Sequence, residues 1–211
     1  MNKHKNIMKR FLLTVAALFA VSALFAQTAE QIIAKMDKVT ENFDSEGVYM
    51  IMDMKIPILG TISTQMYTLG QKSKATTKAL GEETIIWSDE KTEWIYDSKK
   101  NEITIKNADP SDSDDEMSVL DGITDGYDVE VKKEDAKVWQ IACTKSKDNP
   151  DKDAPKKMTL KIAKGTYLPV SISMTAKGVT VVLRNFKPGV KEADVTFDPS
   201  LYPNATIVDK R

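Results

Sequence analysis

Thr84 to Asp97 read T-I-I-W-S-D-E-K-T-E-W-I-Y-D, and this stretch decides how the fold is interpreted. Ile85 to Trp87 and Thr92 to Tyr96 are rich in β-branched and aromatic residues, which favour strands. Ser88 to Lys91 have the composition of a turn. The stretch therefore predicts a β-hairpin.

A hairpin loop of two or four residues would pair Trp87 with Thr92 and Ile85 with Trp94. Because side chains alternate along a strand, Ile85, Trp87, Trp94 and Tyr96 should then share one face. Two of the three tryptophans lie in this set. Such a face is either an ordinary sheet core or a wall that contacts a ligand.

The N-terminal residues have the pattern of a secretory signal peptide. Four basic residues between Lys3 and Arg10 precede the apolar run from Phe11 to Ala26, which ends in the small-residue region A-L-F-A. We expect cleavage near Ala26, export to the periplasm and a single domain spanning 27–211. The residue after the cut is Gln27 and not the lipid-anchoring cysteine of a bacterial lipoprotein.

Removal of 1–26 changes the composition. The only histidine, His4, leaves, so the mature chain has no Ser-His-Asp site, Cys-His site or histidine-ligated metal centre. Without the four basic residues, 26 Lys and Arg stand against 31 Asp and Glu, a net charge of −5. This acidity argues against nucleic acid as a partner. Cys143 is the only cysteine, so no internal disulfide forms.

The mature chain begins with a helix and continues with strands. Thr28 to Gln31 match a capping box, and apolar residues follow at helical spacing up to Phe43. Later segments alternate with period two, and the last strand is expected at Ala193 to Phe197. About ten antiparallel strands fit a two-layer α+β domain or one strongly curved sheet. We favour an α+β fold in which the curved sheet wraps around its helices.

Two features of the middle of the chain suggest a cover over the sheet. The acidic segment Asn107 to Glu116 lacks the spacing of a calcium loop, so we interpret it as a solvated loop. Met117 and Leu120 follow it in a brief apolar element. We expect this element to act as a mobile cover.

Methionine points to a possible ligand surface. Met50, Met52 and Met54 share one face of one predicted strand, and Met66 lies in the next. Flexible thioether side chains suit a surface that accepts several ligand shapes, although they also fill ordinary cores. No phosphate loop, CxxC pair, nucleophile motif or distinctive carboxylate pair is present, so we expect a protein that is not an enzyme and holds no metal or cofactor.

The hairpin resembles that of a known family. I-I-W-S-D-E-K-T-E-W-I-Y, from Ile85 to Tyr96, is similar to the central hairpin of the periplasmic lipoprotein carrier family LolA, with its apolar-apolar-x-S-D-G-K-x-x-W-x-Y pattern. The residues from Val195 to Pro199 and from Ile207 to Arg211 resemble the F-x-P and V-x-D-x-R ending of that family. The order of elements agrees from Thr28 to Arg211.

This resemblance implies an unclosed β-barrel with an N-terminal helix and short lid helices on its concave side, which receives lipoprotein acyl chains. It implies a monomer that takes cargo from an inner-membrane ABC exporter and passes it to an outer-membrane acceptor. The expected acyl-chain contacts are Met50, Met52, Met54, Met66, Ile85, Trp87, Trp94, Tyr96, Met117 and Leu120.

Two departures from the family pattern affect the hairpin and the lid. Glu90 replaces the turn glycine, which argues against a type I′ turn. No arginine lies near Gly70 to Lys72, where the family has one that holds the lid. Lys72 and Lys74 are the candidate lid contacts instead, as point charges without the fork of an arginine.

Two other functions remain open for this chain. An envelope lipid- or glycolipid-binding or sensing protein could use the same scaffold. A structural envelope module with a filled core would bind no ligand.

Overall fold

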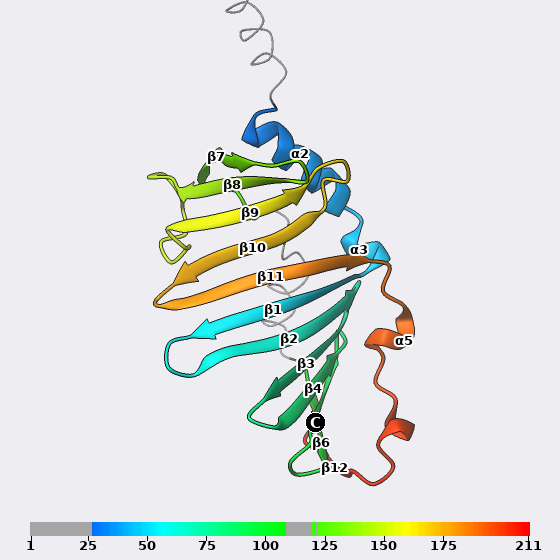
Figure 1. Ribbon diagram of the computed structural model, residues 1–211. Coiled ribbons are helices and arrows are strands. Elements are labelled where there is room, and N and C mark those ends of the chain that lie inside the picture. The colour runs from blue at the N-terminus through cyan, green and yellow to red at the C-terminus, as the bar shows by residue number, and fades with distance from the viewer. Residues whose placement is uncertain (1–26, 109–119, 121) are drawn as a thin grey trace, which may run out of the picture.

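The computed structural model describes residues 27–108, 120 and 122–211 (Figure 1). The predicted signal peptide and Met117 lie outside the described residues.

Helix α2 (Ala29–Thr40) begins at the capping box that the sequence predicts. The backbone N–H of Gln31 donates to Thr28 Oγ1 at 3.3 Å, and the backbone N–H of Thr28 donates to Gln31 Oε1 at 3.2 Å. These bonds satisfy two backbone donors that would otherwise lack partners at the start of the helix. A short helix, α3 (Phe43–Glu46), follows.

In the described residues, twelve strands form one sheet that curves strongly and does not close (Figure 1). Its spatial order is β12-β6-β5-β4-β3-β2-β1-β11-β10-β9-β8-β7, so β12 and β7 are its two free edges. The strands are β1 (Val48–Ile56), β2 (Gly60–Leu69), β3 (Lys72–Ala79), β4 (Glu82–Ser88), β5 (Thr92–Asp97), β6 (Glu102–Asn107), β7 (Tyr127–Glu134), β8 (Val138–Lys145), β9 (Lys157–Ala163), β10 (Pro169–Ala176), β11 (Val179–Pro188) and β12 (Thr206–Asp209). The predicted α+β class with an unclosed barrel is confirmed.

The predicted last strand is wrong. Ala193 to Val195 belong to a short helix, α5 (Glu192–Val195), because the Asp194 carboxylate accepts the backbone N–H of Lys191 at 2.9 Å and caps the turn. The last strand is β12, which pairs with β6 in parallel. The 3₁₀ turn η1 (Pro199–Leu201) lies between α5 and β12 along the chain. The sheet is therefore mixed and not wholly antiparallel.

The predicted hairpin forms as β4 and β5, with a different register. Trp87 pairs with Trp94 and Ile85 with Tyr96, so the predicted pairs Trp87–Thr92 and Ile85–Trp94 are wrong by two residues. A shift of two keeps every side chain on its face, so these four residues share a face as expected. The loop is displaced because the Asp89 carboxylate accepts the backbone N–H of Thr92 at 2.7 Å.

Strand register separates two faces of the sheet. Met50 pairs with Met66, Met66 with Ala75, and Ala75 with Ile86, so these residues share the inner face. Trp87 follows Ile86 in β4 and therefore points to the opposite, outer face.

The main core lies between the inner face and α2. Ile32 and Met36 of the helix are fully buried in one cluster with Met50 and Ile141. Ile85, Trp87, Ile103 and Val195 are also buried but do not belong to this cluster. The sheet thus carries a second, smaller apolar layer on its outer face.

Candidate functional site

The predicted methionines line the inner face of β1 and β2. Met50 is buried, and Met52 and Met66 are partly buried against the main core. Met54 has the same orientation as Met52 by alternation along β1, and it pairs with Val181 of β11. Leu120 also belongs to the core cluster and is 7% exposed.

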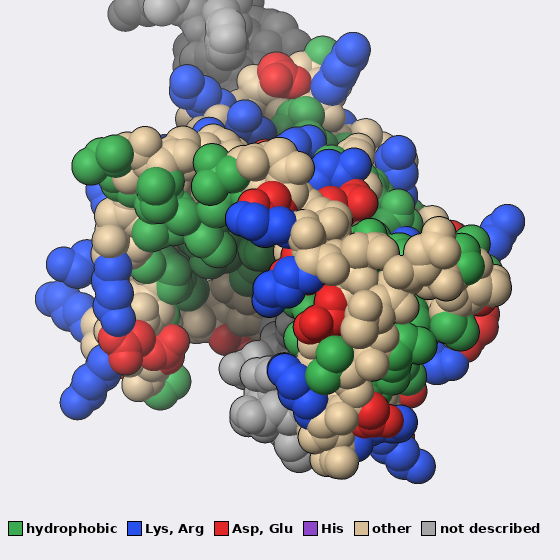
Figure 2. Space-filling model, turned by 90° about the horizontal axis from the view of Figure 1, so that it is seen from below, with side chains coloured by type: hydrophobic (Ala, Val, Ile, Leu, Met, Phe, Trp, Pro, Cys, Tyr) green, Lys and Arg blue, Asp and Glu red, His purple; other side chains and the backbone are tan. Residues whose placement is uncertain are grey.

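Across β11 the same face continues with apolar side chains. Met54 pairs with Val181, Val181 with Met174, and Met174 with Met158, which lies opposite Cys143. This cross-strand row runs from β1 to β8 without a charged residue. Figure 2 shows hydrophobic side chains gathered along a wall where the molecule is hollowed.

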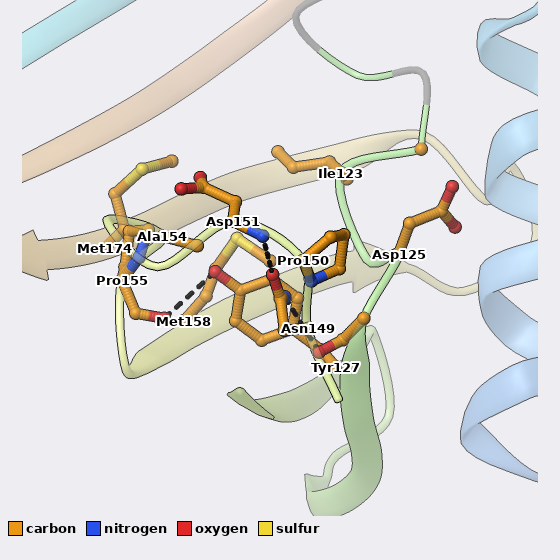
Figure 3. A pocket seen from close by; sticks show the side chains of 12 residues that line it. Ile123, Asp125, Tyr127, Asn149, Pro150, Asp151, Ala154, Pro155, Met158 and Met174 are labelled. Atoms are coloured by element: carbon orange, nitrogen blue, oxygen red, sulfur yellow. Dashed lines mark hydrogen bonds between the residues drawn. The ribbon is translucent and has the colours of Figure 1, made fainter. Parts of the chain in front are cut away.

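A cavity of about 340 Å³ opens at one end of this row. Met158 and Met174 form its floor, while the turn before β7 and the β8–β9 loop form its sides (Figure 3). Its apolar lining includes Ile123, Tyr127, Ala154, Pro150 and Pro155, and its polar lining comes from Asp125, Asn149 and Asp151. The volume lies near the small end of the range for small-molecule sites.

Hydrogen bonds hold the two sides of the cavity together. The Tyr127 hydroxyl donates to the Pro155 carbonyl at 2.9 Å, and the Asn149 amide donates to the Gly126 carbonyl at 2.9 Å (Figure 3). Burial raises the pKa of Tyr127, so the phenol stays protonated at neutral pH and keeps its donor. The cavity is therefore bordered by polar contacts and floored by thioethers.

Over β2 to β6 the inner face also carries polar side chains. From β2 to β4 a row of hydroxyls continues the cross-strand row of Met52, because Met52 pairs with Thr64, Thr64 with Thr77 and Thr77 with Thr84. The Thr64 and Thr77 hydroxyls lie 2.8 Å apart. Further along the inner face, Glu93 forms an ion pair with Lys106 at 3.1 Å. The inner face is thus apolar over β1 and β8–β11, whereas over β2 to β5 polar side chains lie beside the apolar row of Met66, Ala75, Ile86 and Ile95.

The hairpin residues predicted to contact acyl chains do not join the methionines. Trp87 and Trp94 lie on the outer face, with Phe197 between them at 5.3 and 5.6 Å between ring centroids. Tyr202 packs against Tyr96 at 4.6 Å. The C-terminal segment, residues 189–205, thus covers this aromatic face (Figure 1). The predicted set is divided between two faces of the sheet.

Lys72 and Lys74, the candidate lid contacts, also face outward. Lys72 forms an ion pair with Glu192 of α5, which raises the pKa of Lys72 and lowers that of Glu192. The Lys74 ammonium lies over the rings of Trp87 and Tyr67 at 5.6 and 5.9 Å. Lys72 therefore contacts the C-terminal segment, and Lys74 contacts the aromatic rings of the outer face. The predicted lid segment lies largely outside the described residues.

The described residues contain no grouping of three or more histidine, cysteine or carboxylate side chains placed to hold a metal. Cys143 is 1% exposed, and burial raises the pKa of its thiol to about 12. Such a thiol is a core side chain and not a nucleophile.

The sequence prediction omitted most of the cavity lining. Met158 and Met174 stand out in their strands by alternation alone, but only their pairing shows that they are adjacent. The two prolines and Asn149 lie in a loop whose composition suggests only solvent exposure. No sequence pattern signals that this loop folds back over the sheet.

Comparison with solved structures finds proteins of similar fold. No protein-family profile and no curated protein sequence matches this chain. LprF from Mycobacterium bovis superposes with a TM-score of 0.50 at 10% identity, covering 79% of this chain and 96% of LprF. An uncharacterized conserved protein from Thermus thermophilus gives 0.49 at 17% identity, covering 84% and 98%.

The LolA superfamily protein NE2245 from Nitrosomonas europaea has a TM-score of 0.39 at 13% identity, covering 83% of this chain and all of that protein. This chain is similar in fold to these solved structures, and a LolA superfamily protein is among them. The resemblance predicted from the hairpin is thereby confirmed for the fold. In the described residues of this chain, no helix has the length and apolar character needed to cross a bilayer.

Proposed function

We propose that this chain is a periplasmic carrier that binds lipoprotein acyl chains against its inner face and carries lipoproteins from the inner to the outer membrane. The observation that supports the proposal is the uncharged row from Met54 to Met158, which ends in a cavity floored by Met158 and Met174. On this proposal an inner-membrane ABC exporter supplies the cargo and an outer-membrane acceptor receives it.

Acyl chains need such a surface because water opposes their transfer. At about 0.8 kcal/mol per CH₂, a chain of about 16 carbons costs on the order of 13 kcal/mol to expose. A carrier must replace most of that burial and then release the chain, so the bound and released states should differ in how the inner face is covered. Thioether side chains suit this task because they repack around chains of different shape.

The functional contacts on this proposal are the inner-face residues. Met50, Met52, Met54, Met66 and Leu120 are retained from the sequence prediction, and Met158, Met174 and Ile123 join them. Ile85, Trp87, Trp94 and Tyr96 are replaced in this role, because the C-terminal segment covers their face.

The test is recovery of cargo from the periplasm. The protein purified from periplasm should carry acylated lipoproteins that mass spectrometry identifies, and it should bind a fluorescent fatty acid. Met174→Lys should weaken probe binding at least tenfold by placing a charge on the cavity floor. Val170→Lys, on the same strand but at a 41% exposed residue, is the control and should bind normally. Protein that carries no lipoprotein and binds no probe would exclude a carrier.

A second function is favoured by one observation. The row of hydroxyls on the inner face, Thr64, Thr77 and Thr84, and the modest cavity volume suit an amphipathic lipid with one or two chains and a polar headgroup. An envelope lipid- or glycolipid-binding protein would have these properties. Mass spectrometry separates the two functions, because it would then find free lipid and no lipoprotein in the purified protein.

A further inference from the structure

Three large aliphatic side chains stand almost fully in solvent on two turns of the sheet. Ile58 and Leu59 lie in the β1–β2 turn and are 106% and 75% exposed, and Leu80 in the β3–β4 turn is 102% exposed. Turns of soluble proteins usually carry polar residues and glycine. Large exposed apolar side chains that lie together mark interaction sites more often than chance.

The two turns lie at the same end of their strands. β1 and β3 are both antiparallel to β2, so they end on the same side. In the β2–β3 register Ser63 pairs with Lys78, and continuing that register places Leu80 level with Thr61, the partner of Lys55. Figure 1 shows the β1–β2 turn projecting from this end of the strands, at the left of the view. Ile58, Leu59 and Leu80 thus project from the same end of neighbouring strands, with Ile58 and Leu59 beyond Leu80, and we name these three residues the apolar tip.

The backbone at the tip is unusual for these residue types. Ile58 has φ = +74° and Leu80 has φ = +53°. The left-handed region is unfavourable for bulky side chains and most of all for β-branched isoleucine. Glycine adopts this backbone without strain, as Gly60 and Gly81 do at φ = +89° and +84°, yet Ile58 and Leu80 also have left-handed backbone in these turns. Strained residues of this kind are concentrated at functional sites.

The tip lies on the same side of the sheet as the cavity. β8 and β10 run in the same direction as β1. The β8–β9 loop that borders the cavity therefore projects from the same end of the strands as the tip. A flat apolar phase that received Ile58 and Leu80 would therefore lie at the end of the strands from which the cavity-lining β8–β9 loop projects. We propose that the apolar tip docks this protein on a lipid bilayer, with the cavity opening turned toward the membrane.

A bilayer fits the tip better than a protein partner does. Specific protein interfaces bury about 800 Å² per partner and use some 20–30 residues, with aromatic and arginine residues at their centre. Three aliphatic side chains on separate turns supply neither that area nor that chemistry. Insertion into lipid needs no complementary shape, and a shallow apolar insertion gives the weak, reversible attachment that repeated docking requires.

Charge plays a small part in this docking. The lysines beside the tip have acidic partners: Lys78 pairs with Glu83 at 3.0 Å, and Lys99 pairs with Glu82 at 2.5 Å. Lys55 is exposed and adds one positive charge near the β1–β2 turn. Docking should therefore change less than about threefold when salt rises from low to physiological concentration, unlike that of a basic patch.

The experiment measures binding of the full protein to vesicles of phosphatidylethanolamine and phosphatidylglycerol by flotation. Ile58→Ser, Leu59→Ser and Leu80→Ser should each weaken binding about tenfold, which corresponds to burial of one aliphatic side chain. Leu201→Ser is the matched control, because Leu201 is 70% exposed in η1 and lies outside the tip. Thermal unfolding should not change, since the tip side chains are exposed.

A second measurement tests directly whether residue 80 inserts into the bilayer. Leu80→Cys can be labelled with an environment-sensitive dye because Cys143 is 1% exposed. The dye at residue 80 should shift to the blue on vesicles, and the dye in a Leu201→Cys variant should not. Absence of vesicle binding, equal losses in the tip and control variants, or binding abolished by salt alone would each overturn the proposal. Fatty-acid probe binding in free solution should persist in all tip variants, so failure of docking is distinct from failure of the proposed carrier function.

Discussion

The ring of Trp94 stacks on that of Phe197, with 5.6 Å between centroids and 20° between ring planes. Trp94 comes from the central hairpin and Phe197 from the C-terminal segment. Phe197 also contacts the edge of Trp87 at 5.3 Å. One phenyl ring therefore joins both hairpin tryptophans to the C-terminal segment, and the aromatic face serves the cohesion of the fold.

Phe197→Ala should destabilise the protein by about 2 kcal/mol, because it removes a half-buried ring and two aromatic contacts. Tryptophan emission should shift to the red as the hairpin rings gain water. Fatty-acid probe binding to the folded protein should stay within about twofold, since the inner face is unchanged. Leu201→Ala, which removes an exposed side chain from the same segment, should cost less than about 0.5 kcal/mol. Loss of probe binding in Phe197→Ala at temperatures where it is folded would contradict this assignment.

The hairpin loop gives a prediction about Glu90, which replaces the glycine of the family pattern. The Asp89 carboxylate accepts the backbone N–H groups of Lys91 and Thr92 at 2.8 and 2.7 Å, and Glu90 has no positive φ. Glycine is therefore not required, and Glu90→Gly should lower stability by a few tenths of a kcal/mol to about 1 kcal/mol through a freer unfolded chain. Asp89→Ala should cost about 1–2 kcal/mol by analogy with lost caps. Chemical denaturation measures both, and a stabilising Glu90→Gly would show that the loop needs positive φ.

Asp53 gives a prediction about acid stability. On the outer face its carboxylate accepts Arg184 Nε–H at 2.6 Å and the Ser63 hydroxyl at 2.6 Å. The arginine hydrogen bond lowers the pKa of Asp53, an effect that burial opposes. A lowered pKa in the folded state contributes stability above the unfolded value of about 3.9, and this contribution disappears as pH falls through the folded value.

Asp53→Asn should therefore cost about 1–3 kcal/mol at pH 7, and the difference from the parent protein should shrink below about pH 4. Urea denaturation at a series of pH values measures this difference. Asp128→Asn is the control, because Asp128 is an exposed residue of β7. A pH-independent difference would mean that the charge of Asp53 is not what stabilises the strand pair.

Local patterns in the sequence were sufficient for the elements but not for the site. Composition and alternation predicted the β4–β5 hairpin and the strands that follow the first helix, and the capping box predicted α2. Ala193 to Phe197 also alternate, but a cap from Asp194 to Lys191 converts their first part into α5. The parallel pairing of β12 with β6 joins residues about a hundred positions apart, and no local pattern reports it.

The relation between the methionines and the tryptophans was beyond such patterns for a specific reason. Whether Met50 and Trp87 share a face depends on the registers of β1–β2, β2–β3 and β3–β4 in succession, and a change of one residue in any of them reverses the answer. The sequence identifies each apolar face separately. It does not show that one face receives α2 and the other receives Phe197 and Tyr202.

Cys143 offers a probe of how the inner face opens. Its thiol lies in the cross-strand row between Val129 and Met158, is 1% exposed and has a pKa raised to about 12 by burial. At pH 8 both the low thiolate fraction and the lack of access oppose its reaction. The folded protein should therefore react with a maleimide or disulfide reagent at least a hundredfold more slowly than the unfolded protein.

If acyl chains bind against this row, a saturating fatty acid should slow the residual labelling of Cys143 further, because the ligand favours the state in which the row is covered. The Leu201→Cys variant supplies an exposed thiol in the same molecule, and its labelling should not respond to fatty acid. Labelling of Cys143 that is fast in the absence of denaturant, or a ligand effect equal at both thiols, would contradict the placement of this residue in the ligand-binding wall.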